Sequence, residues 1–100
     1  MENGGLDYVT SINEELQAAE AAKAVLKVLL TTTPKSAVAA TLRKANHAAI
    51  LNLSRARALN EARANAGIAL SILLHSQPTP EKIDKAKVAV EDWINQLRAA

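Results

Sequence analysis

A long stretch without helix-breaking residues constrains the fold of this chain more than any other feature. Between Pro34 and Pro78 the sequence contains no proline and a single glycine, Gly67. Thr33 and Pro34 match a helix N-cap followed by a proline at the first helical position. Because nothing between the two prolines strongly opposes a helix, we predict one long central helix over residues 34–76.

A shorter helix is predicted on each side of the central one. Apolar residues recur at helical spacing over residues 8–31, and the same pattern returns over residues 80–98. Thr79 and Pro80 repeat the N-cap and first-position proline chemistry at the start of the last helix. The sequence therefore predicts an all-α fold with three main helices.

The length of the central helix limits how the three helices can pack. A continuous helix over 34–76 would be ~64 Å long, whereas a compact 100-residue domain has a radius of gyration of about 13 Å. The helix therefore either kinks, with candidate positions at 44–47 and 65–67, or makes the molecule elongated. If the flanking helices fold back along its two halves, one face stays uncovered. The fold class expected is a helical bundle completed by dimerisation.

A row of the central helix follows heptad spacing and is the predicted self-association surface. In an antiparallel homodimer with its two-fold axis between Arg57 and Ala58, the two polar members of the row, Asn52 and Arg63, face each other. The alternative is that the same row packs on the other helices of its own chain. The row consists of Leu42, Ala45, Ala49, Asn52, Ala56, Leu59, Arg63, Ala66, Leu70 and Leu73.

No combination of residues in the sequence matches a catalytic, cofactor-binding or metal-binding motif. The two histidines, His47 and His75, have no carboxylate or cysteine at ligand spacing. No Ser-His-Asp or lysine-based nucleophile can be assembled from the sequence. We therefore expect a protein that is not an enzyme and that holds no cofactor or metal.

The composition of the chain and its N-terminal residues indicate where in the cell the protein is located. The chain has no cysteine, so a disulfide framework is excluded. We predict that residues 1–5 are a flexible lead and that residues 6–100 form a single helical domain. The lead does not resemble a signal peptide. No apolar run in the sequence is long enough to span a membrane. These features predict a cytoplasmic protein without a membrane anchor.

The function predicted from these features is a small helical protein-binding module, a regulator, inhibitor or adaptor that acts sterically through helix faces. The alternative is a nucleic-acid-associated regulator that uses the basic central helix. We expect only weak nucleic-acid binding, because the net charge is +2, aromatics number two, and the arginines scatter around the helix. The predicted partner-binding stripe consists of Arg43, His47, Ile50, Arg57 and Glu61.

Overall fold

The structure, a computed structural model, describes residues 12–28, 36–51 and 57–99, and within these residues the chain is all-α, without a strand. The described residues form four helices, which are α1 (Ile12–Val28), α2 (Ser36–Leu51), α3 (Arg57–His75) and α4 (Pro80–Ala99).

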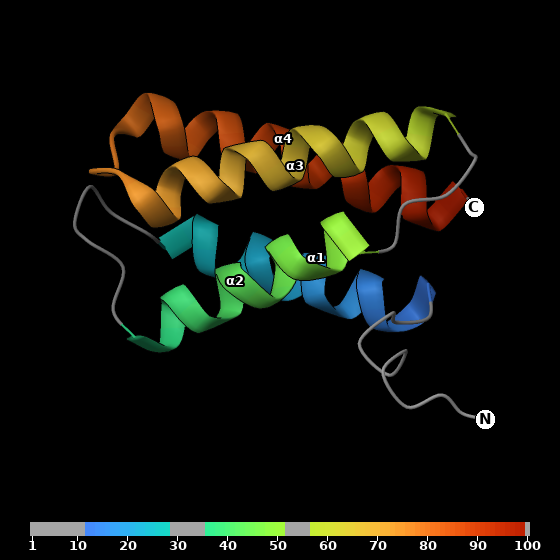
Figure 1. Cartoon of the computed structure of the whole chain (residues 1–100), viewed down its shortest axis with the longest axis horizontal. Helices are drawn as coiled ribbons and strands as arrows, with labels where there is room; N and C mark the ends of the chain where they lie inside the picture. Colours follow the sequence, from blue (N-terminus) through green and yellow to red (C-terminus); the bar gives the residue numbers. More distant parts are fainter. Residues whose placement is uncertain (1–11, 29–35, 52–56, 100) are drawn as a thin grey trace.

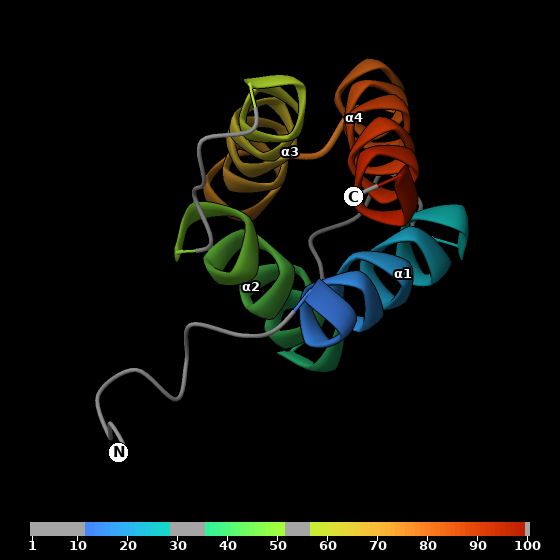
Figure 2. The same cartoon turned by 90° about the vertical axis from the view of Figure 1, so that its right-hand side faces the viewer.

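The four helices form an antiparallel bundle in which each helix packs against two others. Helix α1 contacts α2 and α4, and α3 also contacts α2 and α4, so α1 and α3 lie on one diagonal. Figure 1 shows that successive helices run in opposite directions, and Figure 2 shows them at the four corners of the bundle. The radius of gyration is 13.1 Å and the longest dimension is 42 Å. A straight helix of ~64 Å would not fit within these dimensions.

The prediction of one continuous central helix is wrong. Helix α2 ends at Leu51, and α3 begins at Arg57 and runs back beside it. Both candidate kinks, at 44–47 and 65–67, lie inside regular helix. Residues 52–56 contain neither glycine nor proline, so the sequence gives no local signal for two helices. Two antiparallel helices can place their apolar rows against one shared core, and this favours the reversal.

The other two predicted helices are confirmed where the structure describes them. Helix α4 matches the predicted range 80–98 within one residue, and α1 covers 12–28 of the predicted 8–31. The Thr79 side-chain oxygen accepts a hydrogen bond of 3.2 Å from the backbone N–H of Lys82, as an N-cap should. The lead at 1–5 and the cap at Thr33 lie outside the described residues.

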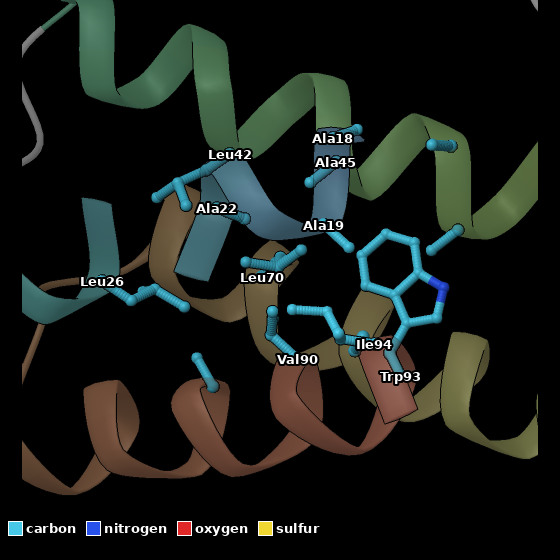
Figure 3. Packing of buried hydrophobic residues seen from close by; sticks show 14 of the residues in the cluster. Ala18, Ala19, Ala22, Leu26, Leu42, Ala45, Leu70, Val90, Trp93 and Ile94 are labelled. Carbon is cyan, nitrogen blue, oxygen red and sulfur yellow. The ribbon is translucent and has the colours of Figure 1, made fainter. Parts of the chain in front are cut away.

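Small and aliphatic side chains from all four helices fill the bundle interior. Alanines on α1, α2 and α3 lie within the same cluster as leucines and as Trp93 of α4, whose indole lies inside the bundle (Figure 3). Alanine at the helix contacts lets the backbones approach closely. The predicted self-association row supplies much of this core. Its members Leu42, Ala45, Ala49, Leu59, Arg63, Ala66, Leu70 and Leu73 are buried, and Asn52 and Ala56 lie outside the described residues.

A buried ion pair connects three of the helices through this core. Arg63 of α3 donates two hydrogen bonds of 2.7 Å, from Nε and Nη2, to the two carboxylate oxygens of Glu15 on α1. Trp93 of α4 donates its indole N–H to Glu15 Oε2 at 2.8 Å. Glu15 and Trp93 are 0% exposed and Arg63 is 2% exposed. The pair therefore fixes how α3 is rotated and placed against α1 and α4.

Arg63 thus has a partner in its own chain, whereas the sequence pattern predicted Asn52 of a second copy. The antiparallel pairing expected between two chains resembles the packing of α2 on α3 within one chain. Because a single chain buries the described members of the row, a second copy is not needed to cover them. The homodimer itself stays a prediction.

Candidate functional site

Three isoleucines around α3 point away from the core and define what we call the isoleucine surface. Ile50 of α2 and Ile68 and Ile72 of α3 are 54%, 62% and 43% exposed. Isolated exposed apolar residues are ordinary, but a contiguous group marks an interaction surface. These three residues line two hollows that share Ile68, so they are neighbours on the surface and form a candidate site.

The first hollow lies between α2 and α3 and has a volume of about 360 Å³. Its walls are mostly apolar, and the guanidinium of Arg63 at its inner side is already bound to Glu15. We call it the α2–α3 hollow. Its lining residues are Asn46, Ala49, Ile50, Arg63, Ala64, Gly67, Ile68 and Ser71.

Two residues of the α2–α3 hollow are expected to lower the stability of the fold, and the packing around them does not require these residue types. Gly67 sits inside a helix without a positive φ, and a Cβ there would lie 3.6 Å from Ile50 Cγ1, an ordinary contact. Alanine would therefore fit at position 67. Asn46 is buried, and within the described part of the chain its Oδ1 has no hydrogen-bond partner. Residues that weaken a fold without a structural reason tend to collect at functional sites.

Replacing Gly67 by alanine is expected to stabilise the bundle by about 0.5–1 kcal/mol, because glycine is the poorer helix former and the new methyl group meets no clash. Urea unfolding followed by circular dichroism measures the difference. A loss of stability of Gly67→Ala would mean that the close packing of α2 on α3 requires glycine, and would remove the argument that this position serves binding.

The second hollow lies between α3 and α4, has a volume of about 430 Å³, and combines an apolar floor with a basic edge. Lys82 and Lys85 of α4 supply that edge. The Lys82 ammonium donates to Ser76 Oγ at 3.1 Å and to the Gln77 carbonyl oxygen at 3.0 Å, which holds it near the end of α3. We call it the α3–α4 groove. Its lining residues are Asn65, Ile68, Ala69, Ile72, Lys82, Lys85 and Ala89.

The predicted partner-binding stripe contributes one residue to the hollows. Ile50 lines the α2–α3 hollow. The other four members are exposed on α2 and at the start of α3, and none of them lines either hollow. These four are Arg43, His47, Arg57 and Glu61.

Sequence reasoning missed Ile68 and Ile72, although the signal was present. Steps of three and four from Arg57 through Glu61 lead along α3 to Ile68 and then to Ile72. The predicted stripe stopped after Glu61. The lysines on α4 carried no signal, because nothing in the sequence shows that they lie beside α3.

The histidines stay apart in the structure. His47 is exposed on α2, and His75 at the end of α3 has its Nδ1 2.9 Å from the Ser71 carbonyl oxygen. Within residues 12–28, 36–51 and 57–99, no three histidine or acidic side chains gather as metal ligands would. In the same residues, no helix has the length and apolar character of a membrane span.

Comparison of the chain with protein-family models, with curated proteins and with solved structures found no match.

Proposed function

We propose that this chain is a small non-enzymatic helical module that binds another protein through the isoleucine surface, and that it regulates, inhibits or adapts that protein by steric contact. The observation that carries the proposal is the exposure of Ile50, Ile68 and Ile72 on two adjoining hollows. The core is filled by other residues, so these three are not needed to complete it.

The chemistry of the two hollows supports binding in preference to catalysis. Their lining residues include no carboxylate, histidine or cysteine, the side chains that most often act as general acid, general base or thiol nucleophile. Of the cationic groups in the lining, Arg63 is engaged by Glu15. Apart from Lys82, Lys85 and the Ser71 hydroxyl, the remaining walls are apolar side chains and amides, which suit a protein interface with an apolar centre and a polar rim.

Photo-crosslinking in host cells tests the proposal. A photoreactive residue in place of Ile68 is expected to form an adduct with one protein. The matched control is position 28, because Val28 is 73% exposed on α1, which lies diagonally opposite α3. Adducts of equal yield from position 28, or no adduct from position 68, would contradict the proposal. An adduct consisting of two copies of the chain would assign the surface to a homodimer.

The alternative function, nucleic-acid binding, predicts a continuous basic surface. Arg43, Lys44 and Arg57 are exposed, but Arg63 is buried in the ion pair with Glu15. We therefore expect only charge-driven binding to DNA or RNA, with a Kd of roughly 10⁻⁴–10⁻⁶ M at physiological salt. Electrophoretic shifts at two salt concentrations measure this. Nanomolar binding that depends on sequence and survives physiological salt would favour the alternative.

A further inference from the structure

We infer that the α3–α4 groove receives one amphipathic helix of the partner protein, and that this helix carries carboxylates along the edge that faces Lys82 and Lys85. The inference rests on the proposed function and adds the structural class and the charge of the partner segment.

The dimensions of the groove favour a helix. Its α3 residues extend from Asn65 to Ile72 and its α4 residues from Lys82 to Ala89. Each run covers about two helical turns, or roughly 10 Å. This length matches a helix that binds through apolar side chains at positions i, i+3 or i+4, and i+7. A partner strand would need an exposed sheet edge, and the described residues form helices only.

The positive charge of the groove favours a partner helix that carries carboxylates along one edge. Neither Lys82 nor Lys85 forms an ion pair with any described residue, and no acidic residue lines the groove. The Lys82 ammonium donates hydrogen bonds to Ser76 and Gln77, but among the described residues neither lysine has a carboxylate as partner. Carboxylates of a partner would therefore meet two ammonium groups without an ion-pair partner beside an apolar floor, which favours association and fixes orientation. A second copy of the same groove would bring lysines toward lysines, so a different, acidic chain suits it better.

Two synthetic peptides test the inference. Both are helical, about four turns long, with one identical leucine stripe, and they carry either glutamates or lysines beside that stripe. We expect the acidic peptide to bind at least ~10-fold more tightly, a difference of about 1.4 kcal/mol. In the methyl NMR spectrum, the signals of Ile68 and Ile72 should move, and that of Ile50, which lines only the α2–α3 hollow, should not.

Charge reversal provides the control for the peptides. Lys82→Glu with Lys85→Glu is expected to remove or invert the preference for the acidic peptide. A glutamate at position 82 also completes a capping box with Thr79, so α4 should stay folded. Lys27→Glu with Lys44→Glu makes the same change of net charge outside the groove and should leave the preference unchanged.

Several results would overturn the inference. These are equal binding of both peptides, preference for the basic one, no binding of either at ~1 mM, or movement of Ile50 in place of Ile72. Tight binding to phosphatidylserine vesicles that Lys82→Glu with Lys85→Glu abolishes would assign the groove to a membrane surface. If the peptides fail while position 68 still crosslinks to another protein, the helix assignment is wrong and the proposed function stands.

Discussion

Replacement of Arg63 by methionine is expected to destabilise the bundle by about 3–5 kcal/mol, the loss typical when one member of a buried ion pair is removed. Methionine fills similar space but donates no hydrogen bond, so the Glu15 carboxylate loses two charge-assisted bonds of 2.7 Å while it stays buried. Domains of this size are stable by only about 5–15 kcal/mol. Urea unfolding followed by circular dichroism measures the change.

Two further variants show whether the loss of stability comes from the buried position of the ion pair or from the removal of a charge as such. Lys23→Met breaks an ion pair of 3.5 Å with Glu91 on the surface and should change the stability by no more than about 1 kcal/mol. Glu15→Leu with Arg63→Met removes both charges and should recover part of the loss, although the Trp93 N–H then lacks its acceptor. If Arg63→Met lost less than about 1 kcal/mol, the ion pair would not organise the core as described.

Replacement of Ala66 by glutamate is expected to prevent the bundle from folding, with a loss of more than about 4 kcal/mol. Ala66 is 0% exposed, so the glutamate would add volume to a filled core and bury a new charge. The homodimer hypothesis makes the opposite prediction, because a charge at a subunit interface would leave a monomer that is still helical. Circular dichroism and sedimentation velocity of the same sample distinguish the two.

A helical Ala66→Glu monomer, derived from a wild-type dimer, would contradict the single-chain core and restore the intermolecular pairing. Ala49→Glu provides an independent repeat of the test, because Ala49 is also 0% exposed but lies on α2.

The helical class and the buried row of α2 and α3 could be predicted from the sequence for physical reasons that act locally. The Thr79 cap and Pro80 determine where α4 begins, and the structure confirms both. The heptad row identified buried positions on α2 and α3 because helical spacing alone decides which side chains share a face. It did not identify the chain that covers them.

The chain reversal could not be predicted because it is a tertiary effect. Residues 52–56 have the composition of a helix, and only the gain from packing α2 on α3 favours two helices. The Glu15–Arg63 pair joins residues far apart in the sequence. The sequence contained one indication of this pair, which was the arginine on an apolar row. A buried arginine needs a carboxylate as its partner. Glu15 lies four residues before the buried Ala19, on the same face of α1.

The candidate site was predictable in part. Ile50 was identified because it interrupts a polar stripe, and the same stripe leads to Ile68 and Ile72 once α3 is treated as a helix of its own. The lysine edge depends on α4 lying beside α3, which only the fold shows.

One face of α3 packs in the core, and the opposite face, which carries Ile68 and Ile72, is exposed and is the face proposed to bind a partner. The most direct test is the unfolding free energy of Ile68→Glu measured beside that of Ala66→Glu, since the two place one carboxylate two residues apart on one helix. We expect Ile68→Glu, at a position 62% exposed, to stay within about 0.5 kcal/mol of the wild type, whereas Ala66→Glu should fail to fold. Equal losses for the two variants would contradict this assignment of the two faces.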